Sequence, residues 1–575
     1  MNEPGTIAPE RRISVRTVAD RSTPFGRRLW ALGPLLDRVL GIDALHRLGE
    51  QCDVFGREPL DFATHALDGM GVRIQGAEQM AARLPREGPV IVVANHPHGG
   101  IEGLIMLRLL MAERDDVKVL ANTALQVFHD LKPVMLFVNP LMPNNPANAK
   151  GLKHSLRHLR EGGVLVVFPA SRTSFYRREL GRISDGEWNR IVASLGRKTG
   201  AAVLPVRFCD FNSDRFYQLG RVWSRFRLLM LARELLNKVD TDITVAVGAA
   251  IPPKHFAHLE EEGFTEALRL LTYSLRPQEP SGAPVEVKEP APLAPARQRE
   301  VVEAEIDTLP PEQIVYEGHG CVVLFGRRAQ FPELVAEITR ERERTFRLLD
   351  EGSGAPVDTD EFDDLADHIV VWDRRGRGLL GAYRMGRRDQ LVQRGGTYLD
   401  QMFEFDDAFF AQHGGALELG RSFVTPEYQR ARHSLDLLWR GIGGFVRAHP
   451  QYTLLYGTVS LTTQYDPVST DMMCDVLIDA PGHVRPKAPL KSRLTPDWAE
   501  YRQRWGIDRL QLDKLIAARE EDGKGLPILV RQYAALGARF HAVGVDPNFA
   551  ATPGLLLSVN IATIPPGKRK RYIDP

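Results

Sequence analysis

The sequence has few cysteines and no long apolar run. Its 575 residues include only four cysteines, which are widely scattered: Cys52, Cys209, Cys321 and Cys474. This spacing predicts no disulfide framework and favours a reducing compartment. The N-terminus is polar and charged, and no stretch approaches the ~20 apolar residues of a membrane-spanning helix. If the protein meets a membrane, we expect it to lie on the surface.

The sequence also lacks an excess of charge of either sign. Its formal net charge of +1 argues against a general nucleic-acid binder, so we expect no nucleic acid among its partners. The hydrophobic and charged fractions, 43% and 26%, are those of an ordinary globular protein. A chain of this length is expected to form at least two large domains.

A proline-rich stretch divides the chain. Residues 277–312 carry prolines among Glu, Ala and Gln: Pro277, Pro280, Pro284, Pro290, Pro292, Pro295, Pro310 and Pro311. Such a composition has little to bury and is typical of a linker. We therefore predict a loose leader over residues 1–25, a first domain over 26–276, this linker, and a second domain over 313–575.

The clearest candidate site follows a predicted strand. Residues 90–94 are apolar, and the chain then turns through a Pro- and Gly-rich loop into a second apolar stretch from Leu104. This pattern places His96 and Glu102 at the carboxyl end of a strand, where reactive groups collect in open α/β sheets. A His with a carboxylate in reach can deprotonate a hydroxyl, because the acid orients the ring and stabilises the imidazolium.

Two other interpretations of this loop remain. A single loop histidine is more often a solvated residue. His96, His98 and Glu102 are also residue types that bind metals. Their spacing matches no zinc signature and no cysteine lies nearby, so we expect no metal and no other cofactor.

Further apolar runs alternate with helical stretches, which predicts an α/β domain with a mostly parallel sheet. The runs lie at residues 117–120, 135–138, 163–168 and 202–208. The third run ends in a turn that presents Ser171 and Arg172, and the fourth contains Pro205. The planar fork of an Arg can hold a phosphate or carboxylate, although a surface salt bridge is its commoner role.

Two stretches combine arginines with large apolar residues. Residues 27–47 have leucines at helical spacing and Trp30 near their start, and residues 215–238 are basic and apolar together. Helices of this kind can rest on an anionic membrane. Core packing of the first stretch, and burial of the second with snorkelling arginines, are the alternatives.

The second half begins another α/β domain. Residues 368–372 and 379–385 flank a turn and predict an antiparallel hairpin, while the composition of the acidic residues between 358 and 367 predicts a solvated loop. Glu418 and Arg421 lie three residues apart on a predicted strand. In a regular strand they would point to opposite faces, so both reach one cleft only if a bulge intervenes.

The first half resembles the lysophospholipid (glycerolipid) acyltransferase family. That family has a His and an Asp separated by four residues, then Phe-Pro-Glu-Gly, then a Pro after apolar residues; the corresponding segments here are 95–103, 168–172 and 203–206. Glu102 replaces the Asp, with one extra residue in between, and Ala170-Ser171 replace Glu-Gly. The resemblance implies that His96 is a base oriented by Glu102. It implies acceptor contacts at Ser171, Arg172 and Pro205, and the departures leave open an acceptor other than lysophosphatidate.

The second half resembles GNAT-type acyltransferases. It is most similar to the ornithine N-acyltransferases, often described as haemolysins, and to the acyl-homoserine-lactone synthases. The matching segments are 367–368, 381–384, 418–422, 438–442 and 456–460. The resemblance implies that Arg384, Glu418 and Arg421, together with Asp363, bind the amino substrate and shape the acyl site.

Joined in this order, the two halves resemble the bifunctional ornithine-lipid synthases. The resemblance implies that the second domain transfers a 3-hydroxyacyl group from acyl carrier protein to the α-amino group of ornithine or a similar amino acid. The first domain would then acylate the new hydroxyl. It also implies a peripheral protein on the cytoplasmic face of the bacterial inner membrane. The alternatives are a lysophosphatidate acyltransferase fused to a separate second half, and a GNAT-like half that only tethers acyl carrier protein or membrane.

Overall fold

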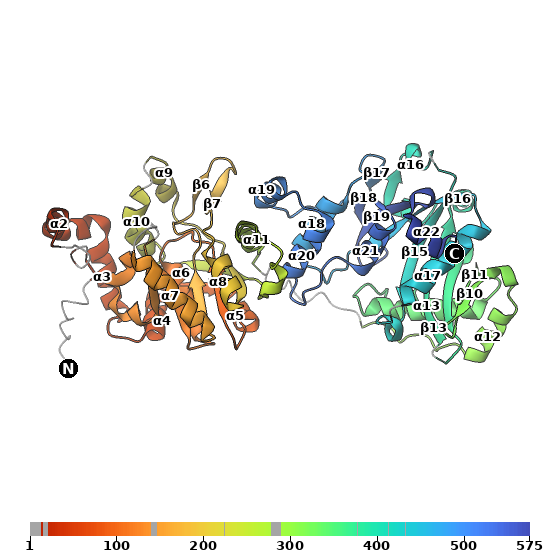
Figure 1. The fold of residues 1–575 in the computed structure, drawn as a ribbon, viewed down its shortest axis with the longest axis horizontal. Helices are drawn as coiled ribbons and strands as arrows, with labels where there is room; N and C mark the ends of the chain where they lie inside the picture. Colours follow the sequence, from red (N-terminus) through yellow and green to blue (C-terminus); the bar gives the residue numbers. More distant parts are fainter. Residues whose placement is uncertain are drawn as a thin grey trace. The chain divides into compact units, whose positions relative to one another are not determined.

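The computed structural model describes residues 13–14, 16, 21–139, 146–222, 225–277, 289–376, 378–411, 413–431 and 433–574. The chain divides into two compact units (Figure 1). Unit 1 consists of residues 1–283, 495–507 and 514–523, and unit 2 consists of residues 284–494, 508–513 and 524–575.

Unit 1 is built on one mostly parallel sheet. From edge to edge its strands are β1 (Arg73–Gln75), β9 (Asp242–Val247), β8 (Ala202–Phe208), β2 (Val90–Ala94), β5 (Val164–Val167), β3 (Val117–Asn122) and β4 (Met135–Val138). Neighbouring strands are parallel except β8 and β9, which are antiparallel. The predicted α/β class and mostly parallel sheet are confirmed.

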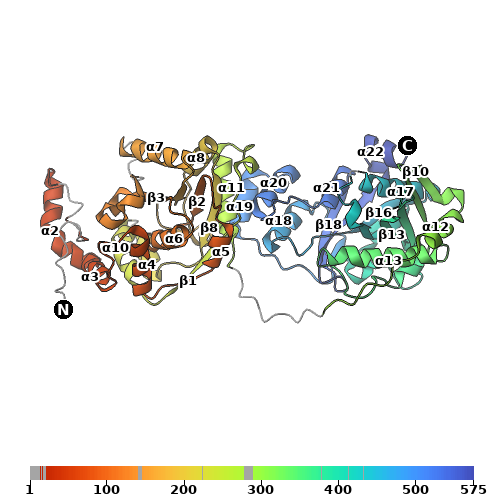
Figure 2. The same cartoon turned by 90° about the horizontal axis from the view of Figure 1, so that it is seen from below.

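Helices cover both faces of this sheet (Figure 2). The helices α4 (Pro59–Gly69) and α6 (Ile101–Met111) lie on one face, and α7 (Pro146–Arg160), α8 (Ile191–Thr199) and α11 (Glu261–Ser274) lie on the other. Val90, Val92 and Ala94 pack into the core on the α4 and α6 side, whereas Ile91 lies near Gly196 of α8. Strand β2 is apolar throughout because both of its faces are covered.

The predicted helix over residues 27–47 is two helices. Helix α2 (Pro24–Leu40) ends at Gly41, whose φ of +79° is a left-handed conformation that glycine adopts readily, and α3 (Ile42–Gln51) follows. Leu32, Leu35 and Val39 on α2 are more than half exposed. Most of the predicted leader lies outside the described residues. Among the residues described, no helix is long and apolar enough to span a bilayer.

The second basic stretch also forms two helices, α9 (Asp214–Val222) and α10 (Arg225–Leu236). A long loop leads from β5 through a two-stranded hairpin, β6 (Phe175–Arg177) and β7 (Arg182–Ser184), before α8. This hairpin and α10 both reach the loop that follows β2, because Ser174 donates its backbone N–H to the carbonyl of His96 and Leu231 lies against Gly99.

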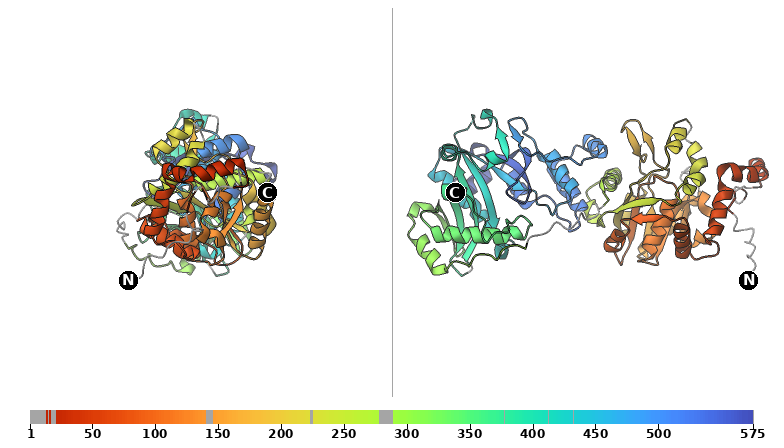
Figure 3. Two further views of the ribbon diagram at one scale, coloured as in Figure 1. Left: turned by 90° about the vertical axis from the view of Figure 1, so that its left-hand side faces the viewer. Right: turned by 180° about the vertical axis from the view of Figure 1, so that it is seen from behind.

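Unit 2 is built on an eight-stranded sheet. In spatial order its strands are β10 (Ile314–Gly318), β11 (Cys321–Arg327), β12 (Asp367–Asp373), β13 (Gly378–Arg387), β15 (Gly415–Val424), β16 (Tyr452–Ser460), β19 (Pro553–Asn560) and β18 (Arg539–Val545). The pair β15–β16 is parallel and the other pairs are antiparallel, including the predicted hairpin β12–β13. Helices α13 (Pro332–Arg347) and α17 (Ser434–Ala448) cover opposite faces (Figures 2 and 3).

The expected domain limits differ from these units within the predicted linker and at residues 495–507 and 514–523 of the predicted second domain, which belong to unit 1. Within the predicted linker, residues 278–288 lie outside the described residues, but 299–307 form helix α12 (Arg299–Asp307), whose Val302 and Ile306 are buried against α13. Helix α19 (Pro496–Trp505), expected in the second domain, belongs to unit 1, where Asp497 pairs with Arg182 and Arg269. Composition alone could not reveal either packing contact.

Candidate functional site

The loop after β2 is fixed to the neighbouring strand β8. The Asn95 amide donates to the carbonyl of Phe208 at 2.9 Å, and the Phe208 N–H donates to the Asn95 amide oxygen at 2.7 Å. This pair of hydrogen bonds ends β2 and directs the chain into the turn. His96 follows at the carboxyl end of the strand, as predicted from the sequence.

His96 and Glu102 lie side by side. Nδ1 of His96 is 3.3 Å from Oε1 of Glu102, which is fully buried at the start of α6. The Glu102 carboxylate also accepts the backbone N–H groups of His98, Gly99 and Gly100 at 2.6–2.9 Å. The loop folds around the carboxylate, so the extra residue between the two side chains still allows the contact. Nδ1 faces the acid, which leaves Nε2 to meet a hydroxyl.

These contacts set the protonation of the pair. Burial lowers the pKa of His96, but the charge and hydrogen bonding of Glu102 and the charge of Asp185 outweigh it, so the net pKa is raised. Burial raises the pKa of Glu102, but His96, His98 and the N–H of Gly99 bring it well below its usual range. Glu102 is therefore ionised, and His96 is a stronger base than a free imidazole.

A second buried carboxylate, Asp185, lies beside the loop and was missed from the sequence. Its Oδ1 accepts the backbone N–H of His96 at 3.3 Å and the Ser174 hydroxyl at 2.5 Å. Its Oδ2 accepts the Trp188 indole N–H at 2.9 Å. Asp185 is 89 residues from His96 in sequence, and only the hairpin β6–β7 brings the two together, so no local pattern could have revealed it.

The other predicted residues of unit 1 lie around this loop at different depths. Ser171 has a left-handed φ of +58°, and its hydroxyl accepts the Asn189 amide at 2.9 Å. Arg172 is exposed. Pro205 is buried inside the sheet, where it pairs in register with Val93 of β2. Ser171 and Arg172 are accessible at the end of the sheet, whereas Pro205 supports the strand beneath the loop.

His98 lies in the same loop as His96 and Glu102 and was a candidate metal ligand. His98 is buried, and burial lowers its pKa, so the ring is neutral. In the part of the chain that the structure describes, no group of three or more His, Cys, Asp or Glu side chains is arranged to hold a metal.

In unit 2, the predicted arginines meet in a buried ionic cluster. Arg384 pairs with Asp360 and, at 3.3 Å, with Asp363. Arg421 lies 3.6 Å from Asp360 and stacks over the Tyr398 ring at 4.8 Å. The structure therefore brings together three of the residues expected from the sequence, Asp363, Arg384 and Arg421.

Further members of this cluster were missed. Arg342 on α13 is buried and pairs with Asp358 at 3.0 Å and with Asp363 at 2.8 Å. The Tyr398 hydroxyl donates to the Asp546 carboxylate, at 2.8 Å to its nearer oxygen. The prediction of a solvated acidic loop was wrong for Asp358, Asp363 and Asp367, which are buried because arginines from three other elements, α13, β13 and β15, neutralise this loop.

A β-bulge in β15 changes the direction in which its side chains point. Arg421 has a left-handed φ of +50°, and the register between β13 and β15 shifts between Ala382 and Arg384. This irregularity breaks the alternation that would send Glu418 and Arg421 to opposite faces. Glu418 is buried and accepts the Leu399 N–H at 2.9 Å, and burial raises its pKa. Strand β15 pairs with β16 only as far as Leu419, so Arg421, two residues further along, lies beyond that pairing.

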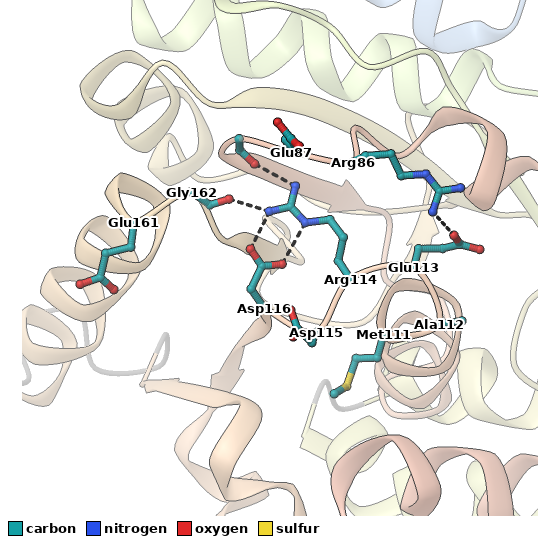
Figure 4. A pocket seen from close by; sticks show the side chains of 11 residues that line it. Arg86, Glu87, Met111, Ala112, Glu113, Arg114, Asp115, Asp116, Glu161 and Gly162 are labelled. Carbon is teal, nitrogen blue, oxygen red and sulfur yellow. Dashed lines mark hydrogen bonds and ion pairs between the residues drawn. The ribbon is translucent and has the colours of Figure 1, made fainter.

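A surface pocket of unit 1 lies at the other end of its sheet (Figure 4). Its lining includes Gly88, Asp116 and Gly162, which come just before the first residues of β2, β3 and β5. Arg114 spans it, donating to Asp116 and to backbone carbonyls that include Gly162. These contacts hold loops together, and the pocket is at the opposite end of the strands from His96.

Comparison with known proteins assigns each unit to a family. The profile of a family described as Acyltransferase matches residues 53–245, and that of the Acetyltransferase (GNAT) domain matches residues 342–440. The glycine N(alpha)-acyltransferase of Bacteroides thetaiotaomicron is 30% identical over 267 residues, covering 42% of this chain and 78% of the relative. Both halves of the chain belong to acyltransferase families. This bifunctional acyltransferase has the fold class and the pairing of families predicted from the sequence.

Two other relatives, each a separate protein, are named for O-acylation and for N-acylation. The lyso-glycine lipid O-acyltransferase of Bacteroides thetaiotaomicron is 31% identical over 219 residues, 36% of this chain and 76% of the relative. The L-ornithine N(alpha)-acyltransferase of Agrobacterium fabrum is 26% identical over 262 residues, 42% of this chain and 84% of the relative.

Proposed function

We propose that the enzyme makes an amino-acid lipid in two successive acyl transfers. In unit 2, the α-amine of the amino acid attacks the thioester carbonyl of a 3-hydroxyacyl donor and the C–S bond breaks. The proton that the amine loses ends on the departing thiolate, so an amide and a free thiol form. In unit 1, Nε2 of His96 takes the proton of the new 3-hydroxyl while its oxygen attacks a second acyl thioester. The departing thiolate then receives that proton.

One observation carries this proposal. The chain joins a His–carboxylate pair able to activate a hydroxyl with a GNAT domain, and its relatives are named for N-acylation of an amino acid and O-acylation of the resulting lyso-lipid. The two steps need different assistance. A neutral amine is a nucleophile by itself, and its ammonium form has a much lower pKa than a hydroxyl, whereas the hydroxyl requires a base.

We propose ornithine as the amino acid, with glycine as the second candidate. Asp360 is the most accessible carboxylate of the Arg–Asp cluster: its side chain is 23% exposed, and it lies between Arg384 and Arg421. A second ammonium group, which ornithine has and glycine lacks, would pair with a partly exposed carboxylate. The relatives named for glycine, at 29–31% identity, favour the other candidate.

We further propose acyl carrier protein as the donor and peripheral attachment to a membrane. Neither transfer requires a metal or another cofactor. The product carries two acyl chains and cannot leave into water, and the exposed leucines and arginines of α2 supply a surface that suits an anionic bilayer.

Lipid mass spectrometry of a host that lacks aminolipids tests the proposal. Expression of the chain should give an N-acylated, O-acylated amino acid, and its mass would identify ornithine or glycine. The purified enzyme should then form the same lipid from the amino acid and acyl carrier protein thioesters. A host whose lipids change only in phosphatidate species would support lysophosphatidate as the acceptor and contradict the proposal.

A further inference from the structure

Two segments of unit 1 converge on the loop that carries His96. Gly99 has a φ of +92°, and a side chain there would come within 2.6 Å of both Thr173 and Leu231. Thr173 follows the turn after β5, and Leu231 lies on α10. The catalytic loop is therefore held between the start of the β6–β7 hairpin and one face of α10.

Each of these two segments carries an arginine close in sequence to the residue that meets Gly99. Arg172 directly precedes Thr173, and Arg227 lies one helical turn before Leu231, on the same side of α10. The Arg227 guanidinium stacks over the Phe175 ring, 4.9 Å from its centroid. Phe175 follows Arg172 by three residues, so this contact brings Arg227 to the segment that carries Arg172. Partial burial lowers the pKa of Arg227, and the charge of Arg172 lowers it further.

Neither Arg172 nor Arg227 has an acidic partner among the described residues, whereas arginines of the β6–β7 hairpin do. Arg177, for example, pairs with Glu179 at 2.6 Å and with Glu500 at 3.4 Å. Arg227 is partly buried and Arg172 is exposed, and two positive charges on neighbouring segments repel each other. An anion between them would remove this repulsion and could accept hydrogen bonds from both guanidinium groups.

We propose that Arg172 and Arg227 together bind the carboxylate of the lyso-aminolipid acceptor and so place its hydroxyl at His96. The inference rests on the proposed O-acylation and adds to it the group that is recognised and a residue, Arg227, on a different element from the predicted site. In the acceptor, only an amide and a few carbons separate the carboxylate from the 3-hydroxyl. Binding the carboxylate beside the Gly99 turn therefore restricts where the hydroxyl can lie.

Steady-state kinetics with two acceptors test the site. The full-length enzyme is assayed in neutral detergent micelles with the lyso-lipid acid and with its methyl ester, which lacks the negative charge. Arg227→Gln should raise the KM for the acid about 10-fold or more, with kcat little changed, and should leave the KM for the ester as in the wild type. Arg172→Gln should behave alike, and Arg227→Lys should restore part of the loss.

The control is Arg197→Ala, an exposed arginine of α8, which should change neither KM. Equal rises in KM for acid and ester would overturn the proposal, as would a rise only in the KM for the acyl donor, because the anion bound would then be the phosphodiester of the carrier's pantetheine. A thermal melt for each variant excludes unfolding as the cause. Failure of the proposed function itself would be distinct, since the wild-type enzyme would then acylate neither acceptor.

Discussion

At the scale of the residue, His96 owes its basicity to two carboxylates of different kinds. Glu102 contacts the ring directly, whereas Asp185 contacts the backbone N–H of His96 and acts on the ring through its charge. Both carboxylates raise the pKa of the imidazole, whereas burial alone would lower it. The rate of O-acylation should therefore report on each carboxylate separately.

Replacing the base should separate the two reactions. His96→Ala removes the proton acceptor, so O-acylation should fall about 100-fold or more while N-acylation continues, and the lyso-lipid should accumulate. Lipid mass spectrometry of the purified reaction measures both products. Normal amounts of diacylated lipid from this variant would exclude His96 as the base.

The pH profile of O-acylation should reveal Glu102. The base must be neutral, and its pKa is raised, so the rate should be lost as pH falls through a value above the ~6.5 of a free imidazole. Glu102→Gln removes the charge that raises this pKa, and the acidic limb should move to lower pH with a smaller maximal rate. An unmoved limb would show that Glu102 does not act on the ring.

Asp185→Asn should shift the same limb to lower pH by a smaller amount than Glu102→Gln does. The amide oxygen can still accept from His96 and Ser174, so the loop keeps its contacts and only the charge is lost. Trp188→Phe removes a donor to the other oxygen but keeps the charge, so its limb should stay in place. If both variants shift the limb equally, Asp185 supports the fold and not the basicity of His96.

At the scale of the element, the bulge in β15 determines how Arg421 enters the ionic cluster of unit 2. Arg421→Ala should remove a cation from the cluster and lower N-acylation about 100-fold, since the ion pairs of Arg421 with Asp358 and Asp360 are lost. Supplying purified lyso-lipid should restore diacylated product. Arg440→Ala on α17, where the arginine pairs with Asp436, is the control and should leave N-acylation intact. No restoration by lyso-lipid, with an unchanged thermal melt, would contradict separate sites.

The sequence could predict structure that forms within one local segment, but not contacts between distant elements. The strand, turn and helix around His96 are local, so apolar runs and glycines were enough to predict them. Arg342 lies on a helix rich in charged residues, and the acidic loop has the composition of a solvated segment. Neither looked buried until it was known that Arg342 pairs with this loop, and that the loop also pairs with arginines on β13 and β15. The site of unit 2 depends on charges that neutralise one another across elements, which composition does not record.

At the scale of the whole molecule, two separable sites predict complementation between variants. The lyso-lipid has one acyl chain and a charged head group, so it can move between enzyme molecules through a bilayer. Neither His96→Ala nor Arg421→Ala alone should make diacylated lipid from free amino acid. A mixture of the two full-length variants with vesicles should make it. Persistent absence of product from the mixture would mean that the intermediate passes only within one molecule.

Attachment to the membrane should depend on one face of α2. Leu32, Leu35 and Val39 follow helical spacing and are 54%, 62% and 53% exposed, and Arg28 and Arg38 on the same helix are exposed as well. Each arginine near an anionic surface contributes about 1 kcal/mol, and each inserted aliphatic side chain adds a comparable amount. Flotation with anionic vesicles should therefore show binding that weakens as salt rises.

The double variant Leu35→Glu and Val39→Glu should reduce this binding about 10-fold or more, because it places two carboxylates where the apolar side chains would enter the bilayer. Ile528→Glu is the matched control: Ile528 is an aliphatic residue that is 62% exposed on α21 (Ile528–Ala535) in unit 2, and its replacement should leave flotation unchanged. Binding of the double variant that equals the wild type would exclude α2 as the membrane-contacting element. Loss of binding in the control as well would show that any added negative charge repels the protein from anionic vesicles. The assay would then be repeated with neutral vesicles, where only apolar insertion contributes, and α2 should still account for the difference between the two variants.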